Sequence, residues 1–140
     1  MFPADFPPDD LEFVPGLPFG RHGQSLDLLR LRARSARPAP AILHLHGGAW
    51  VRFGRWAPAN VFLARAGFVT VSADYRLAPG SIFPAQLGDV GEAVTWLRAN
   101  AGAWQLDPAR LGAWGVSAGP IWRRCWAPGQ VRGASRPCRR

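Results

Sequence analysis

Apolar residues along the chain gather in two patterns: short continuous runs, and longer stretches with helical spacing. The continuous runs at 41–45, 68–73 and 111–114 predict buried strands, because a strand covered on both faces is apolar throughout. Apolar residues three and four apart predict an amphipathic helix over 84–101, and a proline in the first turn predicts a helix over 58–66. This alternation of strands and helices predicts the parallel units of an α/β sheet.

The N-terminal part of the chain has a weaker pattern. Residues 2–18 are rich in proline and show no periodicity, which predicts an extended segment that crosses the surface. Residues 25–33 alternate roughly between apolar and polar, which predicts an antiparallel edge strand with one face in water. Residues 107–110 predict a turn before the last strand. We therefore expect one domain with one edge strand or hairpin and three buried parallel strands.

The strand at 111–114 runs into a G-x-S-x-G motif, with the letters G-V-S-A-G at residues 115–119. The two glycines let the chain turn sharply, with Ser117 at the apex. A serine oxygen is a weak nucleophile until a base removes its proton. Such a turn exposes the hydroxyl and places the N–H of Ala118 where an oxyanion develops. Alone, the motif also fits an ordinary glycine-rich loop, since the chain has 16 glycines.

A second strand end carries backbone N–H groups that no strand partner uses. The run at 41–45 leads into H-G-G-A-W at residues 46–50, which contains a glycine pair. Two neighbouring strand ends of this kind can form an oxyanion hole, the set of donors that stabilises a tetrahedral intermediate. The two motifs together therefore predict acyl-transfer chemistry.

Three sequence blocks in this order resemble the α/β-hydrolase family, in its esterase branch with an H-G-G-x-W or H-G-G-G motif. They are H-G-G-A-W at 46–50, D-Y-R-L-A-P at 74–79 and G-V-S-A-G at 115–119. The three together are much more specific than any one of them, and the resemblance covers residues 10–119. Within the family, aryl esterases, carbohydrate esterases similar to feruloyl esterases, amidases similar to arylformamidase and peptidases of the same fold all stay open, and the H-G-G-x-W form favours the carbohydrate esterases and the formamidases.

The resemblance implies a fold, an activity and a set of site residues. The fold is the N-terminal half of a doubly wound, mostly parallel α/β-hydrolase sheet. The activity is hydrolysis of carboxylic ester or amide bonds, with Ser117 as the catalytic nucleophile. Backbone N–H groups for the oxyanion hole come from Gly47, Gly48, Ala49 and Ala118. The resemblance also implies that His46 braces the oxyanion loop by hydrogen bonding.

The acid and base of a serine hydrolase triad are absent from the sequence. The hydrolase order is serine, then acid, then histidine, and no Asp, Glu or His follows Ser117. Asp74 precedes the nucleophile, so we expect it to form a structural Asp–Arg pair within its own loop. We therefore expect this chain to be inactive or severely impaired.

The C-terminal residues depart from the family. If one base is lost near codon 120, Cys125–Trp126 spells only Leu in the shifted frame, and Trp126–Ala127 spells only Gly. Other positions of the shifted frame allow more than one residue, His or Tyr at the first of them and Ala among the choices at two others. One allowed string, G-x-H-L-A-A-L-L-G, resembles the helix that the family places after the nucleophile turn. We therefore expect residues 1–119 to form a partial α/β-hydrolase domain. We expect residues 120–140 to be a basic tail that is out of frame and disordered.

The net charge of +8 raises nucleic-acid binding as an alternative. The chain has 17 basic residues against 9 acidic ones, and residues 121–140 contain six arginines and no acid. A non-catalytic basic protein could bind nucleic acid through this arginine tail. Because most of the excess charge belongs to the tail, we favour a small-molecule ester or amide as the partner and do not expect nucleic acid.

Several other classes of protein are disfavoured. No apolar run approaches the length of a membrane span, and the N-terminus lacks a signal-peptide layout, so we expect a cytoplasmic protein without a membrane partner. Cys125 and Cys138 are too few for a disulfide framework. His44 and His46 lie two residues apart without a third ligand nearby, so we expect no metal and no cofactor. For His44 we expect a packing role.

Overall fold

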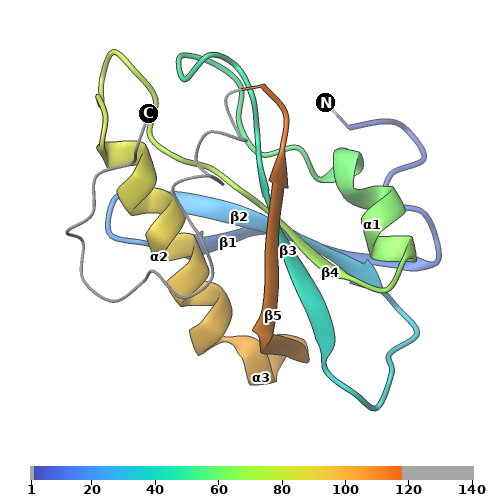
Figure 1. Ribbon diagram of the computed structural model, residues 1–140. Coiled ribbons are helices and arrows are strands. Elements are labelled where there is room, and N and C mark those ends of the chain that lie inside the picture. The colour runs from blue at the N-terminus through green and yellow to red at the C-terminus, as the bar shows by residue number, and fades with distance from the viewer. Residues whose placement is uncertain (1, 118–140) are drawn as a thin grey trace.

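The computed structural model describes residues 2–117 of the chain. In this part a five-stranded sheet has the order β1-β2-β4-β3-β5, with helices on both sides (Figure 1). The strands are β1 (Leu11–Phe19), β2 (Gln24–Leu31), β3 (Ala39–Leu45), β4 (Val69–Ala73) and β5 (Leu106–Gly115). The helical elements are the 3-10 helix η1 (Ala57–Asn60) and the α-helices α1 (Val61–Arg65), α2 (Ala85–Ala99) and α3 (Ala101–Trp104). The predicted α/β class is confirmed.

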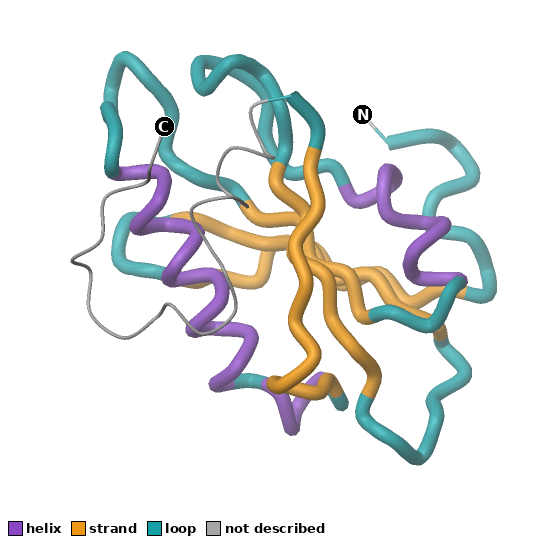
Figure 2. Tube along the Cα trace, viewed as in Figure 1, coloured by secondary structure: helices purple, strands orange, loops and turns teal. Residues whose placement is uncertain are grey.

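The sheet has an antiparallel part and a parallel part. β2 pairs antiparallel with both β1 and β4, whereas β3 pairs parallel with both β4 and β5. A short turn joins β1 to β2, which only antiparallel neighbours allow. Parallel strands need longer crossovers. Helices provide them both before and after β4 in the chain, as Figure 2 shows. The prediction of three parallel strands is confirmed, but the burial predicted for 111–114 is wrong: these residues are partly exposed because β5 lies at the edge of the sheet formed by residues 2–117.

The prediction for residues 2–18 is wrong in its second half, which forms the edge strand β1. Pro15 and Gly16 lie at an irregularity in the pairing of β1 with β2. Gly16 has a φ of +67°, and its N–H donates to Asp27 Oδ1 at 2.9 Å. A proline and a glycine at such a position mark a bulge in an edge strand, and this bulge hides the strand periodicity in the sequence.

β2 is an inner strand, which corrects the prediction of an edge strand over 25–33. Leu28 belongs to the main hydrophobic core, while Leu29 packs with Leu11 and Ala64 in a second cluster. Successive residues of a strand point to opposite faces, so two adjacent buried leucines mean that both faces of β2 are covered. The alternation is therefore imperfect because neither face is wet.

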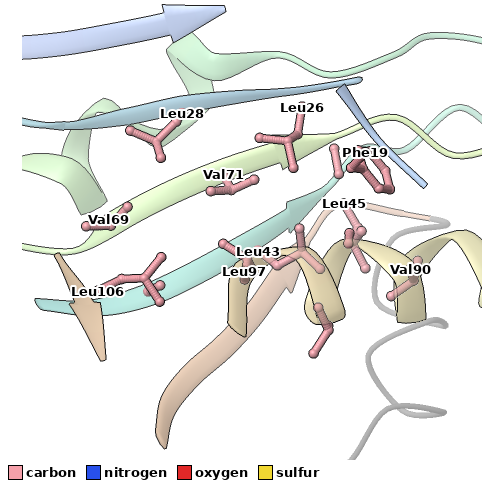
Figure 3. Packing of buried hydrophobic residues seen from close by; sticks show 14 of the residues in the cluster. Phe19, Leu26, Leu28, Leu43, Leu45, Val69, Val71, Val90, Leu97 and Leu106 are labelled. Carbon is pink, nitrogen blue, oxygen red and sulfur yellow. The ribbon is translucent and has the colours of Figure 1, made fainter. Parts of the chain in front are cut away.

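The main core lies between the sheet and α2. Val90, Val94 and Leu97 of α2 are 3% exposed or less, as the predicted stripe requires. Figure 3 shows Val90 and Leu97 beside Leu43 and Leu45 of β3. Full burial of each such side chain contributes about 1.5–3 kcal/mol. These contacts fix β3 and therefore the position at which the chain leaves it.

The boundaries of three predicted elements need correction. The helix predicted over 58–66 begins as η1 and becomes α-helical only at Val61, and the helix predicted over 84–101 breaks at Asn100 into α2 and α3. The turn predicted over 107–110 lies within β5, where the Ala109 N–H donates to Asp107 Oδ1 and the pairing with β3 is irregular. Of the described helices, none has the length and apolar character that crossing a membrane requires.

Candidate active site

Three strands end side by side, and each continues into one of the sequence blocks described above. In the parallel register, Leu45 of β3 is opposite both Ala73 of β4 and Gly115 of β5. The blocks at 46–50 and 74–79 follow β3 and β4 directly. Ser117 follows β5. Figure 1 shows these strand ends at the top of the sheet, where α/β proteins gather their functional loops.

Ser117 lies in a strained turn at the end of β5. It is exposed and has a φ of +57°, in the left-handed region that non-glycine residues seldom adopt. A Cβ atom added to Gly47 would lie 2.9 Å from the carbonyl oxygen of Val116 and 3.3 Å from Ser117 Cβ. The glycine therefore allows the loop after β3 to approach the serine turn closely. Ala118 lies outside the described residues, so the position of its N–H is not part of this geometry.

The loop after β3 has an unusual backbone. Gly48 has a φ of +110°, and Ala49 and Trp50 have φ values of +52° and +65°. A Cβ at Gly48 would lie 2.1 Å from the carbonyl oxygen of Arg52, so this position also requires glycine. Left-handed non-glycine residues cost of the order of 1–3 kcal/mol each and occur where surrounding structure enforces them. Within residues 2–117, the non-glycine residues with positive φ are Ala49, Trp50, Phe53, Gln105 and Ser117.

His46 is held at the start of this loop by two contacts. Its Nδ1 lies 2.7 Å from the carbonyl oxygen of Gly47, and because a carbonyl only accepts, Nδ1 carries the proton. Its ring stacks on Tyr75, with centroids 4.2 Å apart, and the Tyr75 hydroxyl donates to the His46 carbonyl at 2.6 Å. Burial lowers the pKa of His46, although the hydrogen bond to Gly47 and the charge of Asp74 oppose this shift. His46 is therefore a neutral, oriented side chain.

Asp74 forms an ion pair with Arg55, not with an arginine of its own loop. Its carboxylate contacts the Arg55 guanidinium and accepts the Arg55 backbone N–H at 3.0 Å. Arg55 also donates to the buried Asp27 at 2.8 Å, while Arg76 pairs with Asp89 of α2. The prediction of a pair within the loop is wrong because the extended segment after β4 contains no turn that would join residues 74 and 76. Asp74 instead anchors the loop after β3 to the sheet.

His44 belongs to a buried chain of polar side chains that sequence reasoning missed. Its Nδ1 lies 3.1 Å from Ser72 Oγ, and its ring stacks on Trp114 with centroids 5.1 Å apart. Asn60 donates to Ser72 Oγ at 2.8 Å and accepts from Trp114 Nε1 at 3.0 Å. Burial, with a smaller contribution from His46, lowers the pKa of His44 to about 4. The one signal in the sequence was Ser72, a polar residue within a buried apolar run.

A metal is not suggested by the geometry of the described residues. Within 2–117, no group of three His, Cys, Asp or Glu side chains could hold an ion. The arrangement presents an exposed serine at the end of β5, close to the glycine pair of the loop after β3.

Comparison with known proteins identifies the family of this fold. The BD-FAE family model matches residues 26–121. Esterase LipC of Mycobacterium tuberculosis is 36% identical over 99 residues, which are 69% of this chain and 25% of LipC. An arylesterase of Saccharolobus solfataricus is 35% identical over 81 residues, 56% of this chain and 26% of the arylesterase. The chain thus spans about a quarter of the length of the curated relatives it matches.

Solved structures give the same result. A bacterial heroin esterase superposes with a TM-score of 0.70 at 25% identity, covering 86% of this chain and 40% of the esterase. Esterase B of Lactobacillus rhamnosis superposes with a TM-score of 0.75 at 24% identity, covering 82% of this chain and 39% of the esterase, which supports the fold. With its family model matched over most of the described residues, the chain belongs to the BD-FAE family of α/β-hydrolase esterases.

Proposed function

We propose that this chain carries the N-terminal half of a serine hydrolase site that acts on carboxylic ester or amide bonds of small molecules. The observation that carries the proposal is the close approach of Gly47 to Ser117, which has a φ of +57° at the end of β5. A strained, exposed serine against a glycine pair is the arrangement that nucleophilic acyl transfer requires. The esterase names of the relatives support the same reaction.

In the proposed reaction, Ser117 Oγ attacks the carbonyl carbon and its proton passes to a base. The backbone N–H groups of Gly47, Gly48, Ala49 and Ala118 stabilise the negative oxygen of the tetrahedral intermediate. Collapse of this intermediate expels the alcohol or amine, which takes up a proton, and leaves an acyl-serine. Water then releases the acid. His46 braces the loop, because its bond to the Gly47 carbonyl fixes the direction of the neighbouring N–H groups.

Among residues 2–117, no side chain is hydrogen-bonded to Ser117 as a base. His46 is buried, with its Nδ1–H on the Gly47 carbonyl and its Nε2 without a hydrogen-bond partner, and His44 is buried beside Ser72. No acid or histidine follows Ser117 in the sequence. Loss of the triad partners leaves oxyanion stabilisation alone, about 10³–10⁴-fold over water in a well-studied serine protease. We therefore propose that the 140-residue chain turns over esters very slowly, and that full activity needs an acid and a histidine in the order typical of hydrolases.

The nucleic-acid alternative receives no support. It concerns the arginines of residues 121–140, which lie outside the described residues, and the relatives named above are esterases.

Chemical rescue tests the proposal. Free imidazole in the buffer can replace the missing base, so hydrolysis of a small activated ester should acquire a component that depends on Ser117. We compare the wild-type chain, Ser117→Ala and, as a matched control, Ser81→Ala in an unrelated loop. The difference in rate between wild type and Ser117→Ala should grow with imidazole concentration, while Ser81→Ala follows the wild type. Equal rates in all three chains at every concentration would contradict the proposal.

A further inference from the structure

Beneath the candidate site, polar side chains are buried on the face of the sheet opposite α2. Asn60 is 1% exposed, Ser72 0% and His44 3%, and each has a hydrogen-bond partner within this group. Trp114 is partly buried and donates its indole N–H to Asn60. Burial of an amide or a hydroxyl costs stability unless each group is hydrogen-bonded, so such a chain needs a reason beyond packing.

The hydrogen bonds form one connected path. Asn60 Nδ2 donates to Ser72 Oγ at 2.8 Å, and the same Ser72 Oγ is hydrogen-bonded to His44 Nδ1, 3.1 Å away. At its other end, Asn60 Oδ1 accepts from Trp114 Nε1 at 3.0 Å. The rings of His44 and Trp114 stack with an interplanar angle of 22°. The two residues are also direct partners in the β3–β5 register. One amide of η1 therefore links β3, β4 and β5.

Each strand residue of this path lies shortly before one of the functional loops. His44 comes two residues before His46, and Ser72 comes two residues before Asp74. Trp114 comes three residues before Ser117. The path therefore joins the three strands just below the edge at which the candidate site is built.

The nucleophile turn has little packing of its own. Val116 is 56% exposed, and Ser117 is exposed with a positive φ. In the sheet of residues 2–117, β5 pairs on one side only, with β3. A strained conformation persists only when its surroundings enforce it, so the turn depends on how firmly the end of β5 is held. The Trp114 side chain is the nearest anchor before it.

We propose that Asn60 is a positioning residue, which acts through Trp114 to hold the Ser117 turn against the oxyanion loop. This inference rests on the proposed function of that loop. Asn60 does not touch the reacting atoms. It fixes the base of the turn on β5 and, through Ser72 and His44, keeps that base in register with the strand that carries Gly47.

A cysteine at position 117 reports on this geometry without the missing triad. In a chain with Cys125→Ser and Cys138→Ser, Ser117→Cys provides a single thiol whose pKa follows from the pH dependence of alkylation by iodoacetamide. Backbone N–H groups that face the thiolate lower its pKa below the ordinary value of about 8.5. Asn60→Leu, which removes both hydrogen bonds at similar volume, should move the pKa back toward this value by about half a unit or more.

Two further variants separate positioning from stability. Trp114→Phe keeps a ring beside His44 but removes the indole N–H, so it should shift the thiol pKa as Asn60→Leu does. The variant that combines Asn60→Leu with Trp114→Phe should shift the thiol pKa no further than either change alone. Thr70→Val is the matched control. Thr70 is 0% exposed on the same face of β4 and donates to the Leu29 carbonyl at 3.0 Å, outside the path. Its loss should lower stability in urea without moving the thiol pKa.

The outcomes are distinct. A lowered thiol pKa that stays unchanged in Asn60→Leu, or that Thr70→Val shifts equally, would overturn the positioning role. An ordinary thiol pKa in the parent chain would overturn both the oxyanion site and the inference. If Asn60→Leu shifts the thiol pKa but imidazole does not rescue ester hydrolysis, the positioning role stands and the proposed reaction is wrong.

Discussion

Gly47 is a residue at which the two halves of the candidate site approach each other closely. The turn after β5 leaves no room for a side chain there, since a Cβ would lie 2.9 Å from the Val116 carbonyl oxygen. The sequence motif predicted that this residue and Ser117 belong to one site. The left-handed conformations of Ala49, Trp50 and Phe53 were not predictable, because intrinsic preference disfavours them and only the folded loop enforces them.

Gly47→Ala should push the oxyanion loop away from Ser117. We expect a loss of about 1–3 kcal/mol in the free energy of unfolding, as overpacking typically causes, and loss of the imidazole-dependent ester hydrolysis. The control is Gly88→Ala in α2, where a Cβ meets nothing within 4 Å. This change should stabilise the helix by about 0.5–1 kcal/mol. Urea unfolding of both variants measures the contrast, and equal effects would contradict the close approach.

The ion pair between Asp89 and Arg76 should make the stability of the fold depend on pH. Burial alone would raise the pKa of Asp89, but the hydrogen bonds from Arg76 outweigh it, so the pKa lies below the ordinary 3.8. A carboxyl with a lowered folded pKa stabilises the fold above its unfolded pKa, and this contribution is lost as pH falls through the folded value. Asp89→Asn should therefore unfold more easily than wild type at pH 7, and the difference should shrink below about pH 4. A difference that is independent of pH would count against the ion pair as its cause.

At the scale of elements, the sequence predicted most where burial dominates. The strand runs at 41–45 and 68–73 and the helix over 84–101 carry patterns that tertiary contacts reinforce. β1 escaped prediction because Pro15 and Gly16 occupy a bulge, which is invisible without the pairing strand. The link from Asn60 to Trp114 escaped prediction because it joins η1 to a strand far along the chain.

The open edge of β5 should make the 140-residue chain self-associate. Within residues 2–117 it pairs on one side only, and exposed apolar side chains such as Phe53, Phe83 and Val116 lie in the loops. An unpaired strand edge is a template for strand addition, and exposed apolar side chains favour association. We expect sedimentation to show oligomers or aggregates at micromolar concentration. A monodisperse monomer with a cooperative melting transition would contradict this.

At the scale of the whole molecule, the chain corresponds to about a quarter of its curated relatives. The order of the three blocks predicted a partial relation, namely the N-terminal half of a hydrolase sheet. The shifted frame inferred from the codons behind residues 125–127 stays a prediction. The acid and the histidine that would complete the catalytic site could not be predicted as residues, since no Asp, Glu or His follows Ser117 in the sequence.

A shift of the reading frame by one base near codon 120 should restore a longer hydrolase. The continued frame should show further strand and helix patterns, with an Asp or Glu and then a His, each just after a predicted strand. Resequencing of the coding DNA and translation onward measure this. An early stop codon in the shifted frame, or the absence of a later histidine, would contradict it.

The central claim is that Ser117 is the nucleophile of an oxyanion site built with Gly47. The most direct measurement is intact-protein and peptide mass spectrometry of the chain after long exposure to an alkyl fluorophosphonate, which modifies activated serines. We expect slow formation of a single adduct on the peptide that contains Ser117, faster with imidazole, and none in Ser117→Ala. An adduct spread over other serines, with Ser117 unmodified, would contradict the account.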